Sequence, residues 1–493
     1  MILYPRFFSP LLGLPQPAGN TFLLGHFPIL YSQPSGEPAR EWINTIPNDG
    51  LIRYLGLFDR ERLLLTSTKA LAEVLNQKAY DFVKPSQIRN GLGRLTGNGV
   101  LMAEGEDHKF QRKHLMPAFS FRHIKNLYPT FWSKARELVE VLEKRSSTYS
   151  KETGEQVLNE IDFMPWSSRV TLDIIGVAGM GQDFEAIQDQ NSDLCQAYRR
   201  AFSFSGGARM LAILNQFLPP WLLRNLPIKR NAELKEANKI IRKTCLQLIK
   251  QKQEKLARNE AADVDILSVS IESGGFSDET LIDQARTFLA AGHETTAAAL
   301  NWATFVLCKY PEVQTRLRQE IRSNLPSFSA ADSQITSLDI DKLVYLQAVC
   351  NEILRFIPPV PNTLRESLVD TSIQGHFVPK GTRIIICPWA INHSESLWDE
   401  DPGVFDPERW LGPGRANSGG GENNYAFMTF FQGPRSCIGQ SFSKAEFACL
   451  VAALFGRFEM EMVDKELKPK LLGGITVKPG VNLMVKMKVV EGW

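Results

Sequence analysis

Cys437 lies in a loop whose residue types could keep a thiol ionised. The run from Phe430 to Gly439 reads FFQGPRSCIG, with Gly433 before the cysteine and Arg435 two residues upstream of it. Backbone N–H groups and a nearby cation favour the thiolate, which is the form that binds a metal, and glycine lets the backbone approach the sulfur closely. For an isolated cysteine, the simpler interpretation is a small buried hydrophobic side chain.

The segment Ala291–Thr296, AGHETT, places an acid next to an alcohol within an expected helix. Gly292 costs about 1 kcal/mol in a helix interior, and a threonine hydroxyl can bond to the carbonyl four residues earlier and bend the helix. We expect this weakened turn to open a groove for a water or a diatomic ligand, where Glu294 and Thr295 could relay protons. The alternative is an ordinary helix turn with solvated polar residues.

The cysteine loop resembles the haem-binding loop of the cytochrome P-450 family, F-x-x-G-x-R-x-C-x-G. Phe430, Gly433, Arg435, Cys437 and Gly439 match every fixed position of that pattern. The resemblance implies that Cys437 is the axial thiolate ligand of the iron in haem b, and that the other four residues shape the cofactor site. A thiolate ligand pushes electron density onto iron and favours O–O cleavage.

The AGHETT run is similar to the oxygen-activation motif of the same family. The similarity implies that Glu294 and Thr295 guide protons to bound oxygen. His293 occupies the variable position of the motif. Its role stays open, with substrate and solvent as the alternatives for what it faces.

A third motif, Glu352 and Arg355, resembles the E-x-x-R of the family. Residues three apart share a helix face, although an exposed pair of this kind would be ordinary. Arg409 matches the arginine of the P-E-R-F motif, with Trp410 in place of phenylalanine. The resemblance implies a Glu352–Arg355–Arg409 network that braces the region around the cysteine loop and has no direct chemical role.

Haem carries two propionates, which need cations or strong donors when buried. His108 and Arg112 lie four residues apart and resemble the W-x-x-x-R of the family, with histidine in place of tryptophan. Arg365 matches another propionate partner, and Arg435 of the cysteine loop is the fourth candidate. The alternative for Arg112 and Arg365 is an ordinary surface charge.

The composition limits the classes of function. The 493 residues are 43% hydrophobic, enough for a large core, and the net charge of +2 argues against nucleic acid as a partner. The seven cysteines are odd in number and scattered, without a C-x-x-C pair. This spacing disfavours a disulfide framework and a structural zinc site.

Helical patterns dominate from about 120 to 356, and the longest expected helix runs from the N-cap candidate Ser277 to Pro311. Strand-like runs cover 51–54, 62–66, 373–378, 383–387 and 482–487. The turn at 379–381 predicts that the two runs beside it pair as a hairpin. We therefore expect a mainly α fold with small β-sheets. The resemblance implies the cytochrome P-450 fold, with a Pro-rich segment over 1–31, one catalytic domain over 32–493, and the long central helix over haem.

The N-terminus is apolar but interrupted by four prolines, and it fits neither a spanning helix nor a secretory signal. In membrane-bound relatives an anchor helix precedes such a hinge, and we expect it to be absent or truncated here. The apolar stretch Phe202–Leu226 could lie in a membrane interface or in the core. The resemblance implies a peripheral membrane contact on the cytosolic face of the endoplasmic reticulum.

The resemblance implies a haem-thiolate monooxygenase that inserts one oxygen atom of O2 into a mostly apolar substrate by hydroxylation or epoxidation. It further implies a monomer in secondary metabolism that receives electrons from an NADPH-dependent flavoprotein reductase, with cytochrome b5 as a possible second donor. The basic residues around Lys113 and Lys125 could steer an acidic reductase or be a solvated face. Two other activities stay open: a haem-thiolate isomerase or dehydratase, and a non-catalytic haem-binding protein.

The segments 96–99 and 117–120 look most like fungal members of the family. By resemblance, the substrate pocket is lined by 86–100, the Ala291 region, 360–364 and 474–477. The substrate itself is left open.

Overall fold

The computed structural model describes residues 3–149, 156–203, 206–215, 218–258, 260, 265–328, 335–472 and 474–493. The chain divides into two compact units, each assembled from three stretches of sequence. The first unit comprises Met1–Pro85, Asn351–Cys437 and Lys470–Gly480. The second unit comprises Ser86–Cys350, Ile438–Pro469 and Val481–Trp493.

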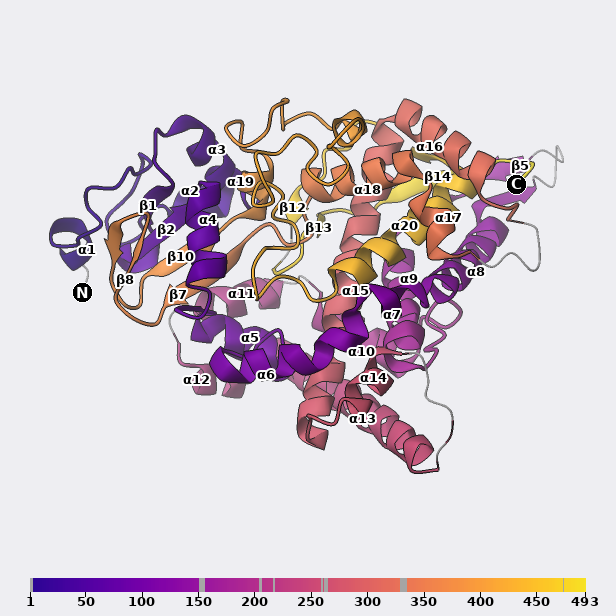
Figure 1. Cartoon of the computed structure of the whole chain (residues 1–493), viewed down its shortest axis with the longest axis horizontal. Helices are drawn as coiled ribbons and strands as arrows, with labels where there is room; N and C mark the ends of the chain where they lie inside the picture. Colours follow the sequence, from indigo (N-terminus) through magenta and orange to yellow (C-terminus); the bar gives the residue numbers. More distant parts are fainter. Residues whose placement is uncertain are drawn as a thin grey trace. The chain divides into compact units, whose positions relative to one another are not determined.

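The first unit contains most of the β-structure (Figure 1). Its strands are β1 (Leu51–Leu55), β2 (Glu61–Leu65), β3 (Phe82–Val83), β7 (Thr363–Ser367), β8 (Thr371–Ile373), β9 (His376–Val378), β10 (Arg383–Ile386), β12 (Leu471–Leu472) and β13 (Lys478–Pro479). Its helices are α1 (Leu3–Phe7), α2 (Phe27–Ser32), α3 (Glu37–Thr45), α4 (Thr68–Ala72) and α19 (Pro388–Asn392). Five strands form one sheet in the order β1-β2-β10-β7-β3. Its middle strand β10 is buried throughout, as its Ile-rich sequence predicts.

The predicted hairpin around residues 379–381 is wrong. The run 373–378 is split between β8 and β9, which pair with each other through a turn at Gln374 and Gly375. Both turn residues have positive φ, 49° and 78°, as a tight two-residue hairpin turn requires. The strand β10 instead pairs in parallel with β2 and antiparallel with β7. The turn therefore lies at Gln374 and Gly375 and not at Pro379.

The second unit is mostly helical. Its helices are α5 (Ser86–Thr96), α6 (Gly105–Leu115), α7 (Phe121–Lys125), α8 (Tyr128–Ser146), α9 (Met164–Ile174), α10 (Asp193–Ala201), α11 (Gly206–Leu214), α12 (Pro220–Asn225), α13 (Lys229–Ala257), α14 (Ile266–Glu272), α15 (Asp278–Lys309), α16 (Pro311–Asn324), α17 (Ser337–Asp341) and α20 (Gln440–Arg457). Its strands are β4 (Ser147–Tyr149), β5 (Gln156–Leu158), β6 (Glu160–Asp162), β11 (Phe458–Met462) and β14 (Met484–Val489). The helix α18 (Val344–Phe356) begins in this unit and ends in the first.

The long helix α15 confirms the element predicted from Ser277 to Pro311. The Ser277 side chain caps it by accepting a hydrogen bond from Thr280 N, and Pro311 begins the next helix. Over 32 residues α15 packs against α9, α13 and α20 (Figure 1). Most of its side chains are buried. A helix buried on so much of its surface gives rigid support to any side chain in its middle turns.

The prediction of a mainly α fold with small β-sheets is confirmed. The expected strands at 51–54, 62–66, 383–387 and 482–487 correspond to β1, β2, β10 and β14. Among the described residues, no helix is both long and apolar enough to span a bilayer. The division into a segment 1–31 and a catalytic domain 32–493 stays a prediction.

Candidate functional site

The cysteine loop folds back on itself through short backbone hydrogen bonds. Cys437 N donates to Phe430 O at 2.9 Å, and Ser436 N donates to Gly433 O at 3.0 Å. Gly433 has a φ of 81°, and a Cβ at this position would collide with Leu75 O. Only glycine therefore combines this backbone conformation with this close approach.

Cys437 differs from the other cysteines in its accessibility. All seven lie within the described residues, and only Cys437 is exposed. Burial raises the pKa of Cys245 and of Cys387 to about 12, so these two thiols stay protonated at neutral pH. The loop thus presents the most accessible of the seven thiols to an incoming metal group.

Glu352 is the centre of a buried hydrogen-bond network in the first unit. Its Oε1 accepts from Arg355 Nη2 at 2.7 Å, from Asp406 N at 2.9 Å and from Arg409 Nε at 3.2 Å. Its Oε2 accepts from Arg355 Nε at 2.8 Å and from Trp410 Nε1 at 2.9 Å. The acid and both arginines are at most 1% exposed. The structure thus brings the three predicted residues together, and Trp410 adds a donor that phenylalanine could not supply.

Asn392 connects this network to the segment that leads into the cysteine loop, and the sequence analysis did not single it out. Its Nδ2 donates to Arg355 O at 3.0 Å and to Thr429 Oγ1 at 2.9 Å. Its Oδ1 accepts from Met428 N at 2.8 Å, while Thr429 Oγ1 donates to Leu354 O at 2.7 Å. A fully buried asparagine that uses both ends of its amide fixes the start of the loop against α18.

Two of the predicted propionate partners, Arg365 and Arg435, lie in the first unit. Arg365 is 5% exposed on β7, where its Nη1 donates to Leu364 O at 2.9 Å. Arg435 Nη1 donates to Phe82 O at 3.0 Å, and its guanidinium lies 6.0 Å from the centre of the Tyr80 ring. Each guanidinium thus has an N–H group bound to a backbone carbonyl, and a guanidinium is the kind of donor that suits a carboxylate.

The proton-relay candidates lie in the middle of α15, in the second unit. Thr295 Oγ1 donates to Ala291 O at 2.9 Å, as predicted, and Glu294 is 4% exposed. Gly292 faces Ile175, where a Cβ would approach to 2.8 Å of the Ile175 side chain. The helix is continuous across the motif, and the groove expected beside it stays a prediction.

His293 is 1% exposed, so its side chain does not face solvent. Its ring lies edge-on to Tyr198 of α10 and to Phe202, the residue that follows this helix, with centroid distances of 4.7 and 5.7 Å. This packing belongs to the second unit and places an imidazole among aromatic rings.

The remaining predicted residues of the second unit lie on two helices. His108 and Arg112 both belong to α6, where His108 is buried and Arg112 is half-buried. Gly439 is the N-cap residue of α20, and its carbonyl accepts from Ser443 N at 2.9 Å. The spacing predicted for one helical face is therefore realised in α6.

Glu446 is a buried acid that the sequence analysis missed. It lies on α20 with no exposed surface, and burial raises its pKa well above the usual value, an effect only partly offset by the hydroxyl of Thr296. Among the described residues, neither carboxyl oxygen of Glu446 nor the Thr296 hydroxyl has a well-formed hydrogen bond. Only the burial pattern of α20, which three-dimensional packing decides, identifies this residue.

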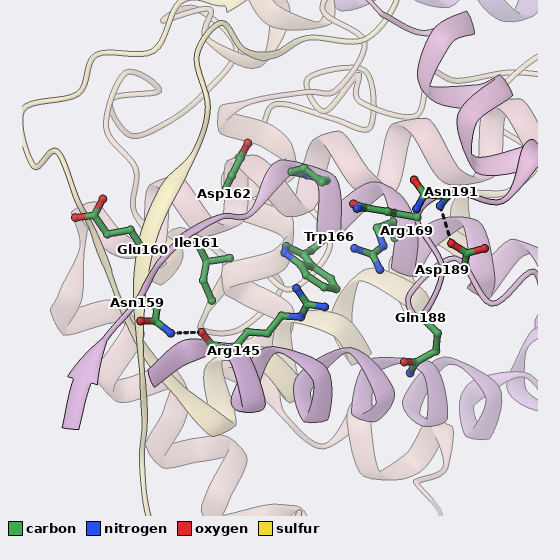
Figure 2. Close-up of a pocket in the computed structure, with 12 residues that line it drawn as sticks. Arg145, Asn159, Glu160, Ile161, Asp162, Trp166, Arg169, Gln188, Asp189 and Asn191 are labelled. Carbon is green, nitrogen blue, oxygen red and sulfur yellow. Dashed lines mark hydrogen bonds between the residues drawn. The ribbon is translucent and has the colours of Figure 1, made fainter. Parts of the chain in front are cut away.

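A polar cavity of about 610 Å³ lies in the second unit between the end of α8, β6, the start of α9 and residues 188–191 (Figure 2). Trp166 stands in it with two guanidiniums over its ring, those of Arg145 at 5.1 Å and Arg169 at 4.0 Å. None of the residues predicted for catalysis or cofactor binding lines this cavity. Its charged lining does not suit a mostly apolar substrate.

Comparisons with known proteins agree with this geometry. The model of the cytochrome P-450 family matches residues 15–487. The chain is 46% identical to the cytochrome P-450 monooxygenase sphH of Aspergillus fumigatus, over 100% of this chain and 91% of the relative. It is 45% identical to the monooxygenase FUM15 of Gibberella moniliformis, over 94% and 85%, and 38% identical to ALT8 of Alternaria alternata, over 100% and 92%.

The chain belongs to the cytochrome P-450 family, and it is a haem-iron monooxygenase of that family. The prediction of fungal-like relatives is confirmed by the organisms of these proteins. The residues present fit a haem group: an exposed thiol in a loop that only glycine allows, and guanidiniums held by carbonyls. A soft thiolate and a set of cations are the donors that haem iron and its carboxylates require.

Proposed function

We propose that Cys437 is the axial thiolate ligand of haem b in this monooxygenase. The observation that carries the proposal is the exposure of Cys437 in a loop closed by its own N–H and by Gly433. Bound haem would supply the iron that binds and activates O2. The loop would hold the sulfur in place, because the Asn392 amide fixes the preceding segment.

The guanidiniums of Arg112, Arg365 and Arg435 are proposed to bind the haem propionates, with His108 as a further donor. Support comes from the position of Arg365 on β7 and of Arg435 in the cysteine loop, where carbonyl contacts orient two guanidiniums, the group that suits a carboxylate. The test replaces Arg365 by Leu and measures haem retention during dilution. Faster haem loss than in the wild type supports the role, and unchanged retention contradicts it.

Glu294 and Thr295 are proposed to deliver protons to bound oxygen. Glu294 is buried in the middle of α15 beside the half-buried Thr295, and the Thr295 bond to Ala291 O leaves its oxygen as an acceptor. Glu294→Gln should lower the fraction of consumed NADPH that yields product, with more hydrogen peroxide released. Unchanged coupling in this variant would refute the relay.

The substrate is proposed to be a small, mostly apolar organic molecule of secondary metabolism. Two segments predicted to line its pocket meet in the first unit, where Val477 N donates to Pro359 O at 2.9 Å, beside 360–364. In the second unit, residues 94–100 are tied to α15 by bonds such as Arg286 Nε to Leu95 O at 3.1 Å and Val100 N to Gln284 Oε1 at 3.0 Å. Spectral titration with a panel of apolar metabolites tests the class.

The protein is proposed to act as a monomer on the cytosolic face of the endoplasmic reticulum, with an NADPH-dependent reductase and possible help from cytochrome b5. Exposed aromatic side chains support membrane contact: in the first unit Phe7, Phe8 and Phe22 are 65%, 73% and 60% exposed, and in the second Trp221 is 67% exposed. Part of the stretch Phe202–Leu226 lies outside the described residues. Trp221→Ser and Leu222→Ser together should weaken liposome binding, which unchanged binding would contradict.

The reductase is proposed to dock on the basic face around α6 and α7. Lys109, Lys113 and Arg122 are exposed there, although Lys109 also pairs with Glu106 at 2.5 Å. Charge reversal at Lys113 and Lys125 should slow reductase-supported turnover and flatten its salt dependence. Identical turnover and salt dependence in this variant would refute the docking face.

A further inference from the structure

We propose that His293 is a positioning residue that fixes the Glu294 carboxyl and shares a proton with it. The proposal rests on the proton-delivery role proposed for Glu294 and adds a second side chain to that site. It follows from the contacts that hold the imidazole on α15, all of which lie within the second unit.

The ring of His293 is held in one orientation. Its Nδ1 lies 2.7 Å from Leu289 O, and a carbonyl oxygen only accepts, so Nδ1 carries a hydrogen. Tyr198 and Phe202 enclose the ring edge-on. Thr171 Oγ1 of α9 lies 3.0 Å from His293 O and 2.9 Å from Ser167 O, so its one hydrogen is shared between the two carbonyls and α9 packs directly against the backbone of His293.

With Nδ1 assigned, the other nitrogen points at an acid. His293 Nε2 lies 3.8 Å from Glu294 Oε2, and the two side chains are 1% and 5% exposed. Consecutive residues of a helix normally point about 100° apart, so this approach requires both side chains to turn toward each other. The separation is too long for a direct hydrogen bond. One bridging water, or a small rotation of either side chain in the loaded enzyme, brings the two atoms within reach of proton transfer.

A buried pair of this kind avoids a net charge when it holds one proton. The proton resides either on Glu294 Oε2, with a neutral imidazole, or on His293 Nε2, with a carboxylate. In either form the Glu294 carboxyl is held at a fixed place on α15. After Glu294 passes on its proton, it receives another through His293 Nε2. An aromatic residue at 293 would fill the same cage and lose this function.

The experiment is a double-mutant cycle in the haem-loaded enzyme with its reductase. His293→Phe keeps a ring between Tyr198 and Phe202, and Glu294→Gln removes the acid. Because positioned acids contribute about 10²–10⁴-fold to proton transfer, we expect His293→Phe to lower the product formed per NADPH about threefold to tenfold in the wild type. In the Glu294→Gln background it should change nothing further.

An infrared difference spectrum provides a readout that is independent of turnover. In ferric enzyme labelled with ¹³C-glutamate, the carboxyl band that disappears in Glu294→Gln should shift in His293→Phe. An unshifted band, or an equal loss of coupling in both backgrounds, overturns the proposal for His293. If Glu294→Gln itself leaves coupling unchanged, the relay proposed for Glu294 fails as well, and the two failures are thereby distinguished.

Discussion

Glu352→Gln tests how much the buried network around Glu352 stabilises the fold. The two carboxylate oxygens accept five hydrogen bonds, three at Oε1 and two at Oε2. Glutamine has one amide oxygen, and its NH₂ group must replace the other acceptor. In the better orientation the NH₂ group faces Arg355 Nε and Trp410 Nε1, so two buried donors lose their acceptor, and both guanidiniums lose the opposing charge.

Breaking a buried ion pair by removing one partner costs about 3–5 kcal/mol. We therefore expect Glu352→Gln to lower the free energy of unfolding by this amount, measured by denaturant titration of the haem-loaded enzyme with circular dichroism and Soret absorbance. Trp410→Phe is the graded control, because it removes one donor to a charged acceptor, worth about 1.5–3 kcal/mol. A Glu352→Gln enzyme within about 1 kcal/mol of the wild type, or less affected than Trp410→Phe, would refute this reasoning.

Three further predictions concern stability. Burial raises the pKa of Glu446 in the folded state, so the stability of the wild type is highest below pH about 4.5 and declines as the pH rises and the carboxyl ionises more readily in the unfolded state. Glu446→Gln cannot ionise, so its free energy of unfolding should gain up to about 3 kcal/mol over that of the wild type between pH 5 and pH 7. A difference that stays constant with pH would contradict this prediction. Burial lowers the pKa of His393 to about 3, so as the pH falls below about 6.5 the imidazole is protonated in the unfolded state but not in the folded state, and the free energy of unfolding falls. In matched denaturant titrations, the wild type should lose about 2 kcal/mol more of this free energy than His393→Asn between pH 7 and pH 5. Gly433→Ala combines a positive φ with a collision at Leu75 O and should lower the free energy of unfolding by about 2–5 kcal/mol. Gly412→Ala is the control, because its φ is 94° and no neighbour is near, and it should cost only about 1–2 kcal/mol. Equal losses in the two variants would refute the effect of the collision.

The sequence predicted the elements that local signals define. Ser277 caps α15 and Pro311 starts the next helix, so a single residue marks each end of the longest helix. The i, i+3 spacing of Glu352 and Arg355 likewise requires only one helix for the pair to meet. Such features need no knowledge of distant contacts.

Other features depend on which distant segments meet. The strand β10 joins β2 and β7 rather than its sequence neighbour, because its Ile-rich run suits a buried central strand. Asn392, Glu446 and the indole of Trp410 gain their roles from partners far along the chain. Composition and spacing did not contain that information, although Trp410 was visible as a departure from the P-E-R-F pattern.

The most direct test of the account is the reduced-CO spectrum of Cys437→Ser beside that of the wild type, recorded on haem-loaded enzyme together with reductase-supported oxygenation. We expect the wild type to give the thiolate-type spectrum. The variant should lose both this spectrum and oxygenase activity while retaining its circular dichroism. A Cys437→Ser enzyme that keeps the thiolate-type spectrum and full activity would show that another group binds the iron, and the assignment of Cys437 would be wrong.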